Sequence, residues 1–214
     1  MYVPSHFEEL RPEVMHELIR RHPLGTLVTL GENGLNANHI PFEIDPDPAP
    51  FGTLRAHVAR NNPVWREHAK VMETLVVFQG AHTYISPSWY ATKQEDSRVV
   101  PTYNYMAVHA YGSLHIVEDR DWLRALLERL TNANEVVAQG VGGAGLWRIS
   151  DAPEAYIEKM LAAIVGIEIP VSRLIGKWKV SQNQSQGNRA SVERALRAKG
   201  EGNVTEMADA VARK

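Results

Sequence analysis

Hydrophobic and polar positions in the first half of the chain follow mainly the two-residue period of β-strands. Short apolar stretches alternate with turn residues, and Asn33-Gly34 between two of them is a strong hairpin signal. The pattern predicts strands at residues 24–30, 35–44, 53–59, 74–78 and 83–86, a β-rich run at 99–117 with Gly112 as a bulge or bend, and a later strand at 167–174.

The period changes to 3.6 residues after Asp119, which predicts an amphipathic helix. Proline positions, N-caps and stop signals predict helices at residues 12–21, 62–70, 119–132, 151–166, 191–199 and 205–213. Because strands and helices do not alternate regularly, a doubly wound parallel sheet is excluded. We expect a mainly β (α+β) fold, a barrel of about six antiparallel strands with peripheral helices. Since a small barrel is filled by its own side chains, a large planar ligand is expected outside it, at a subunit interface.

The composition is that of a soluble globular protein, with 214 residues, 44% hydrophobic and 22% charged. We expect one domain over residues 1–200 and a short C-terminal tail, residues 201–214, that includes the last predicted helix. The absence of cysteine excludes disulfides, a thiolate nucleophile and cysteine-ligated metals. The start of the sequence lacks the apolar run of a signal peptide, so a cytoplasmic protein without a membrane span is expected.

The net charge of −2 is distributed unevenly. The segment from Val171 to Gly200 carries seven basic residues and one acidic residue, a charge of +6, which leaves −8 on the rest of the chain. Such a segment is suited to phosphate, of a nucleotide cofactor or of a nucleic acid, although a solvated helix face has the same composition.

Several familiar motifs carry little weight here. Gly140–Gly145 matches GxGxxG, but it follows a helical stretch and does not open a helix, so we interpret it as a loop. The nine histidines form no HxH or HExxH pattern, and no GxSxG is present, so the sequence supports neither a metal centre nor a serine hydrolase.

Four segments combine groups that suit a phosphate and a flat heteroaromatic ring. They are HVARNNPVW (57–65), with an arginine beside a capped helix start, YISPSWYATK (84–93), PTYNY (101–105) and GKWKVSQN (176–183). Cations, hydroxyls and helix N-termini bind phosphate, and aromatic faces with directed donors bind a ring. Each segment also has a purely structural interpretation, as a cap, a strand or a turn.

Six ordered blocks of the sequence together resemble the PaiB-like family. They are MYVPSHF, HPLGTLVTL with NANHIPF, HVARNNPVW, YISPSWYATK, VVPTYNYMAVHAYG and GKWKVSQNQ, and they extend over residues 1–198. The resemblance implies an FMN-binding negative transcriptional regulator with the Greek-key FMN-binding split barrel, a homodimer with FMN in the dimer groove. It departs at Tyr103, where the family usually has tryptophan, and at the glycine-rich residues 140–145.

The resemblance also implies a set of cofactor-binding residues and no catalytic or metal-binding ones. It places His57, Arg60 and Asn61 near the FMN phosphate, and Ser86, Ser88, Trp89 and Lys93 in the loop over the cofactor. It places Thr102 and Asn104 by the ring or the ribityl chain. It has Lys177, Ser181, Gln182 and Asn183 close the site from the C-terminal part. DNA is expected as a partner through the basic segment 173–199. The alternatives are an FMN-dependent oxidoreductase or flavin reductase, and a haem-binding relative.

Overall fold

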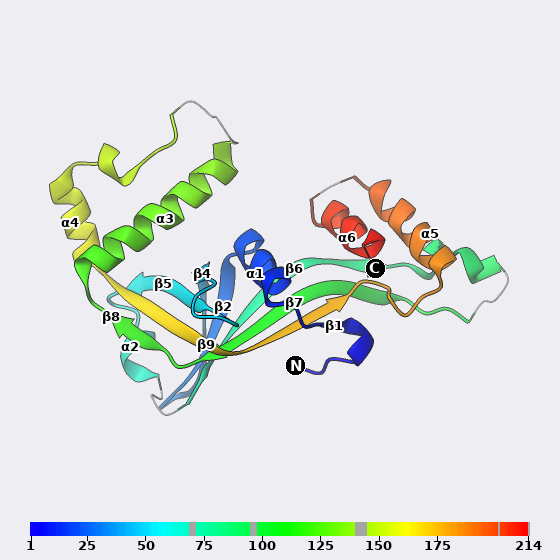
Figure 1. Cartoon of the computed structure of the whole chain (residues 1–214), viewed down its shortest axis with the longest axis horizontal. Helices are drawn as coiled ribbons and strands as arrows, with labels where there is room; N and C mark the ends of the chain where they lie inside the picture. Colours follow the sequence, from blue (N-terminus) through cyan, green and yellow to red (C-terminus); the bar gives the residue numbers. More distant parts are fainter. Residues whose placement is uncertain (69–71, 95–97, 140–144, 201, 214) are drawn as a thin grey trace. The chain divides into compact units, whose positions relative to one another are not determined.

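The fold is known from a computed structural model, which describes residues 1–68, 72–94, 98–139, 145–200 and 202–213 (Figure 1). Nine strands form the sheet in these residues, in the order β3-β2-β6-β7-β9-β5-β4, with β1 and β8 also paired to β9. The antiparallel sheet with peripheral helices is confirmed. The expected number of six strands is wrong, and the order runs from β3 to β4 without closing the sheet.

The extra strands are short segments whose pairing is not visible in the local pattern. They are β1 (Glu8–Glu9), β4 (Glu43–Asp45) and β8 (His115–Val117). Two strands are longer than predicted. Strand β6 (Thr74–Ile85) joins the two strands expected at 74–78 and 83–86. Strand β9 (Ile164–Lys179) extends beyond both ends of the strand expected at 167–174. Strand β7 covers Thr102–Gly112.

The chain forms two compact units, which are described separately. The first contains residues 1–22, 77–110 and 174–214, and the second contains residues 23–76 and 111–173.

In the second unit, β2 (Leu24–Gly31) and β3 (Gly34–Pro41) form the predicted hairpin. Their register runs from Leu24 opposite Pro41 to Gly31 opposite Gly34, and Gly34 has the positive φ of +99° that the turn requires. Strand β5 (Thr53–Ala59) pairs with β4 on one side and with β9 on the other. Helix α2 (Val64–Glu67) is shorter than the predicted helix at 62–70.

Two further helices of the second unit, α3 (Arg120–Gln139) and α4 (Glu154–Ala162), pack around Leu123, Ile157 and Leu161. Helix α3 continues beyond the predicted end at residue 132. The predicted end of α4 at Gly166 is wrong, because Gly166 already lies in β9, where an added Cβ would come within 2.5 Å of the Trp122 ring. The loop predicted at Gly140–Gly145 lies outside the described residues except for Gly145.

In the first unit, helix α1 (Pro12–Arg21) lies close against the strands at two glycines. A Cβ added at Gly80 would lie 2.9 Å from Leu18, and one added at Gly176 would lie 2.7 Å from the sulfur of Met15. Short 3₁₀ turns, Ser5–Phe7, Pro87–Trp89 and Ala91–Gln94, complete the N-terminal and loop regions.

Helices α5 (Gln186–Arg197) and α6 (Gly202–Ala212) also belong to the first unit and pack against each other (Figure 1). Gly200 has a φ of +70°, as the predicted stop after α5 requires. Helix α6 buries Met207, Ala208 and Val211, so the segment treated above as a tail contributes to a hydrophobic core. No described helix has the length and apolar character needed to cross a bilayer.

Candidate functional site

A polar cluster in the first unit is formed by hydroxyl, amide and ammonium groups on β7, on β9 and in the turn after β9. We call it the lysine cluster and define it as Thr102, Asn104, Lys177, Lys179 and Ser181. Asn104, which is 1% exposed, donates a hydrogen bond of 2.9 Å to the Ser181 hydroxyl. The Lys179 ammonium donates to the Thr102 hydroxyl and, at 2.6 Å, to the carbonyl oxygen of Tyr103.

The two lysines of this cluster lack acidic partners. In the part of the chain that the structure describes, neither forms an ion pair with an aspartate or glutamate. Lys177 Nζ donates to the carbonyl oxygen of Tyr2 at 3.0 Å and lies 5.1 Å from the centre of the Tyr105 ring. Desolvation and the nearby charge of Lys177 lower the pKa of Lys179. An anion bound here would relieve both effects.

The turn after β9 holds Ser181 in its place. Ser181 has a φ of +68°, in the left-handed region. Gln182 accepts a hydrogen bond from the Val180 N–H at 2.8 Å and donates to the carbonyl oxygen of Trp178. The Gln182 side chain is therefore used within the turn, whereas Asn183 is exposed.

The loop at 86–93 is organised by its own hydrogen bonds and by α5. Ser86 Oγ accepts from the Ser88 N–H at 3.2 Å, and the two hydroxyl oxygens are 2.7 Å apart. The Trp89 ring lies 4.8 Å from Lys199 Nζ, a cation–π contact. Lys93 is exposed and has no side-chain partner among the described residues.

Aromatic faces accompany these polar groups. Tyr103 is 57% exposed, and its ring meets that of Tyr84 edge-on, with 5.9 Å between the ring centres. Exposed aromatic rings of this kind provide stacking surface for a flat ligand.

In the second unit, Arg60 already has three hydrogen-bond partners within the protein. Its guanidinium donates to Glu118 at 2.7 Å and to the carbonyl oxygens of Ala162 and Ile164 at 3.0 and 3.1 Å. Asn62 caps the following helix by accepting from the Val64 N–H at 3.0 Å, but α2 is only four residues long. Three N–H groups of the arginine in the predicted phosphate cradle are thus used within the protein, and Asn61 is exposed beside it.

His57 lies on β5 opposite Gly166 and carries an unsatisfied atom. Its Nδ1 is buried and has no hydrogen-bond partner in the described residues. Burial lowers the pKa of His57, so the ring is neutral at pH 7. A buried nitrogen without a partner is a candidate contact for a bound ligand.

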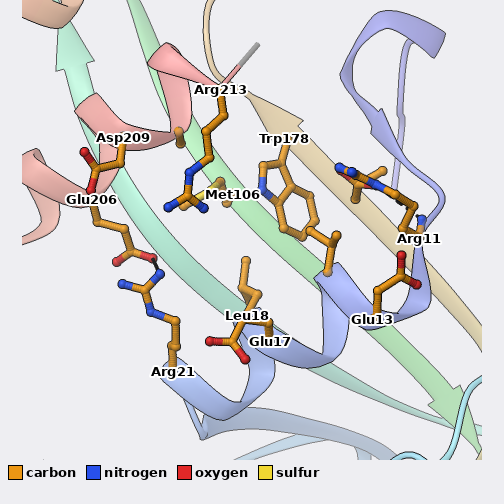
Figure 2. Close-up of a pocket in the computed structure, with 13 residues that line it drawn as sticks. Arg11, Glu13, Glu17, Leu18, Arg21, Met106, Trp178, Glu206, Asp209 and Arg213 are labelled. Carbon is orange, nitrogen blue, oxygen red and sulfur yellow. Dashed lines mark hydrogen bonds and ion pairs between the residues drawn. The ribbon is translucent and has the colours of Figure 1, made fainter.

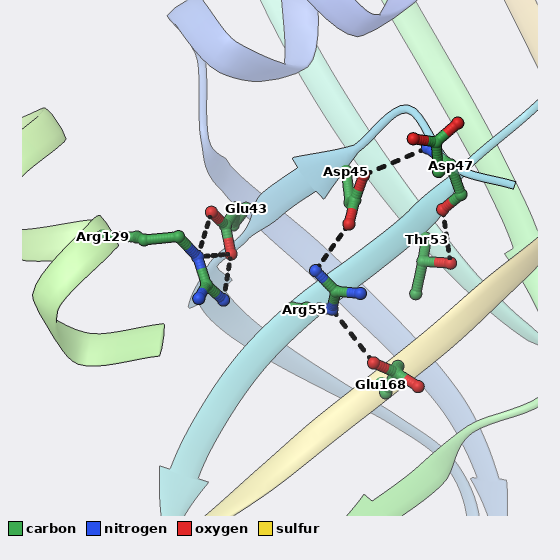
Figure 3. A network of polar contacts seen from close by, with 7 residues as sticks. All are labelled: Glu43, Asp45, Asp47, Thr53, Arg55, Arg129 and Glu168. Atoms are coloured by element: carbon green, nitrogen blue, oxygen red, sulfur yellow. Dashed lines mark hydrogen bonds and ion pairs between the residues drawn. The ribbon is translucent and has the colours of Figure 1, made fainter. Parts of the chain in front are cut away.

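A network of ion pairs joins four elements of the second unit (Figure 3). Arg55 on β5 donates to Asp45 on β4 at 2.7 Å and to Glu168 on β9 at 3.0 Å. Arg129 on α3 donates to Glu43 at 2.7 Å. A hydrogen bond from the Asp47 N–H, with Arg55 nearby, lowers the pKa of Asp45. Since each charge has a partner within the network, we assign it a structural role.

From the predicted set, the structure brings Asn104 together with Ser181. It brings Thr102 together with Lys179, and Lys177 lies close enough to Lys179 to lower its pKa. Two contributing residues were missed by the sequence analysis. Lys179 follows Lys177 by two residues in a strand, and that period was the available signal. Asn188 exchanges hydrogen bonds of 3.1 Å with Thr92, a long-range contact that no local pattern reveals. Among the described residues, no group of His, Asp or Glu could hold a metal ion.

Comparison with known proteins defines the class. The sequence profile of a family described as "Putative FMN-binding domain" matches residues 1–173. The protease synthase and sporulation protein PAI 2 of Bacillus subtilis is 31% identical over 209 residues, which cover 98% of this chain and 95% of that protein. The uncharacterized protein AN0679 of Emericella nidulans is 33% identical over 224 residues, 90% of this chain and 88% of its own.

The fold agrees with this class. The FAD and heme binding protein from Mycobacterium smegmatis has a similar structure, with a TM-score of 0.56 and 16% sequence identity over 80% of this chain and 73% of that one. The fold is thus that of the flavin-binding split-barrel proteins. The chain belongs to the FMN-binding family, with the PaiB-like resemblance confirmed by the Bacillus relative, and FMN is the cofactor that this family assigns.

The lysine cluster fits FMN by its chemistry. Its ammonium groups and hydroxyls suit a phosphate, its amide suits the polar edge of a ring, and the exposed tyrosines beside it suit the ring faces.

Proposed function

We propose that the protein is an FMN-binding negative transcriptional regulator whose flavin is held in the first unit by the lysine cluster. The observation that carries the cofactor part is that Lys177 and Lys179 form no ion pair with an acidic residue in the described part of the chain, while Lys179 donates to the Thr102 hydroxyl. When bound, FMN supplies redox chemistry through its isoalloxazine ring.

Each residue has a role in this proposal. Lys177 and Lys179 bind the phosphate with the Thr102 hydroxyl, and Asn104 and Ser181 orient the polar edge of the ring. Tyr103 offers a stacking face in place of the tryptophan usual in the family. Ser86, Ser88, Trp89 and Lys93 form the loop over the cofactor, and Gln182 and Asn183 shape the turn. His57, Arg60 and Asn61 in the second unit are a separate proposal for phosphate binding, tested by itself.

The cofactor proposal is tested by the visible absorption spectrum of the purified protein, before and after addition of FMN and desalting. A retained flavin spectrum, lost in Lys179→Met and kept in Lys159→Met, is expected. Lys159 is an exposed lysine of α4 and serves as the matched control. A wild-type protein that retains no flavin would falsify the assignment of the cluster.

The regulatory part is supported by the family resemblance and by the name of the Bacillus relative, which refers to protease synthesis and sporulation. One cation of the basic segment 173–199 is occupied, since Arg197 pairs with Glu193 and Asp209. Arg194 is exposed and has no ion-pair partner among the described residues, so it is the cation we expect to contact DNA.

The regulatory test is a gel-shift titration with promoter DNA fragments against competitor DNA at several salt concentrations. A sequence preference and an affinity that falls with salt are expected, with a weaker salt dependence in Arg194→Gln. Equal binding to all DNA, combined with NADH or NADPH oxidation by the FMN-loaded protein, would instead establish the oxidoreductase alternative.

A cytoplasmic homodimer is also part of the proposal. Its support is the exposed apolar surface of the β2–β3 hairpin, formed by Leu24, Leu30 and Leu35, the last 78% exposed. Sedimentation of the wild type and of Leu35→Lys is the test. A monomer in both samples contradicts the dimer.

A further inference from the structure

A cavity of about 410 Å³ lies in the first unit between α1, β7, β9 and α6 (Figure 2). Its apolar lining comes from Val14, Leu18, Met106 and Ala210. Its volume falls within the range of small-ligand pockets, roughly 300–1,000 Å³. None of its lining residues belongs to the lysine cluster. Trp178 lines it from the strand position between Lys177 and Lys179, and successive side chains of a strand point to opposite faces.

Trp178 brings an unused hydrogen-bond donor to this cavity. The residue is only 7% exposed, and its indole N–H has no hydrogen-bond partner among the described residues. In Figure 2 the nitrogen lies on the edge of the ring turned toward the Arg213 guanidinium. This nitrogen is not one of the fully buried side-chain atoms without a partner, so solvent reaches it, and a ligand that supplies an acceptor can take the place of that solvent in the cavity.

The charges around the cavity point to the same kind of ligand. Nearly all its carboxylates already have basic partners within the protein: Glu9 with Arg11 at 2.7 Å, Glu17 with Arg20 at 3.8 Å, Glu206 with His22 at 3.1 Å, and Asp209 with Arg197 at 3.0 Å. Glu13 stands in the first turn of α1, where the helix dipole stabilises a negative charge. Arg213, by contrast, forms no ion pair in the part of the chain that is described. Apart from Glu13, the lining groups that have no partner among the described residues are therefore a donor, the indole N–H of Trp178, and a cation, the exposed Arg213.

We propose that this cavity binds a small carboxylate with an apolar tail. The carboxylate accepts hydrogen bonds from Trp178 Nε1 and from the guanidinium of Arg213, and the tail lies over Leu18, Val14 and Met106. An ordinary hydrophobic pocket does not require the arginine, and a cation-binding pocket does not require the indole donor. The two groups together distinguish a carboxylate site.

The test uses octanoate as the probe and the FMN-saturated full chain labelled with ¹⁵N. Five tryptophans give five indole N–H signals, and the signal absent in Trp178→Phe is that of Trp178. Octanoate is expected to shift this signal in a saturable manner. Octan-1-ol, which lacks the charge, and octylammonium, which reverses it, are expected to bind at least about tenfold more weakly.

Two variants locate the contacts. Arg213→Gln is expected to weaken octanoate binding by about tenfold. Trp178→Phe is expected to weaken it by roughly threefold to tenfold. Because that variant lacks the Trp178 signal, its binding is followed by the shifts of the Met106 methyl group. Lys159→Gln, a change of an exposed lysine in the second unit that is not part of the cavity lining, is the control for net charge. An unshifted Trp178 signal up to the solubility limit of octanoate, tighter binding of octylammonium, or equal binding by Arg213→Gln overturns the proposal. Because FMN is kept saturating and is followed by absorbance, failure of this site is distinguished from failure of the flavin site.

Discussion

The side-chain amide of Asn104 donates a hydrogen bond of 2.9 Å to the hydroxyl of Ser181, a residue 77 positions further along the chain. Both side chains are buried. Ser181 has a left-handed backbone conformation, which few residue types other than glycine adopt, so the bond joins β7 to a turn with a restricted choice of residue. This single contact connects the two segments that supply most of the proposed flavin site.

Changes at Ser181 separate its hydroxyl from its backbone. Ser181→Ala keeps the strained φ and removes the acceptor, whereas Ser181→Gly removes the acceptor and relieves the strain. We expect both variants to lose FMN affinity to a similar degree. The glycine variant is expected to be more stable than the alanine variant by about 1 kcal/mol in urea unfolding. If alanine proves as stable as glycine, the backbone at this position carries no strain.

Asn104→Ala leaves a buried hydroxyl without its donor. A loss of about 1–3 kcal/mol in the free energy of unfolding is expected, together with weaker FMN binding. The control is Asn183→Ala at an exposed position of the same region, which is expected to unfold like the wild type. Chemical denaturation and a fluorescence titration with FMN measure the two effects.

The two lysines should govern the salt dependence of FMN binding. Lys177→Met and Lys179→Met are each expected to weaken binding by about tenfold through loss of a charge-assisted contact. Both should also reduce the change in affinity between low and high salt. A variant that loses affinity but keeps the full salt dependence would show that its lysine acts on the fold and not on the phosphate.

Arg60 can be tested against its own partner. The resemblance places it at the phosphate, and Arg60→Ala is then expected to weaken FMN binding by well over about tenfold. Glu118→Gln removes the carboxylate that holds Arg60 at 2.7 Å and should leave FMN binding equal or stronger. Parallel losses of stability in both variants, with unchanged FMN affinity, would assign Arg60 a structural role only.

The ion-pair network of the second unit predicts a loss of stability in acid. The folded pKa of Asp45 lies below the ordinary value of 3.8, so its contribution is complete above that value and is lost as the pH falls through the lower folded pKa. His57 acts in the same direction at higher pH, since its folded pKa lies below 6.5 and the unfolded state takes up its proton first.

Unfolding followed as a function of pH resolves the two groups. Asp45→Asn is expected to reduce the slope of the free energy of unfolding against pH below pH 3.8. His57→Gln is expected to reduce that slope below pH 6.5. Profiles that keep their wild-type slopes would assign the acid sensitivity to other groups.

Local sequence signals predicted the parts of the fold that local forces determine. The Asn33-Gly34 turn fixes a hairpin register by its own geometry, and Pro12 begins α1 where expected. The end of α4 was missed because Gly166 was taken as the glycine that stops the helix, whereas residues 164–166 pair with β5 and already belong to β9.

The candidate site was predictable only in part for the same reason. The family resemblance nominated Thr102 and Asn104 as well as Arg60, but it could not show that Glu118 occupies Arg60 from a position 58 residues away. Lys179 lies in the segment 176–183 that the sequence analysis singled out, but it was not named as a binding residue, because the strand was predicted to end at residue 174 and its pairing with Lys177 on one strand face was not considered.

The close approach of α1 at Gly80 and Gly176 also offers a means of redesign. Both positions set the distance between this helix and the strands beneath it, and that helix forms one wall of the cavity. A single methyl group at Gly80 presses on Leu18, whereas one at Gly176 presses on Met15 and the Glu9 backbone, so the two substitutions tilt the wall from different points. The width of the cavity, and with it the molecules that the cavity admits, can thus be altered from beneath the helix without replacing any lining residue.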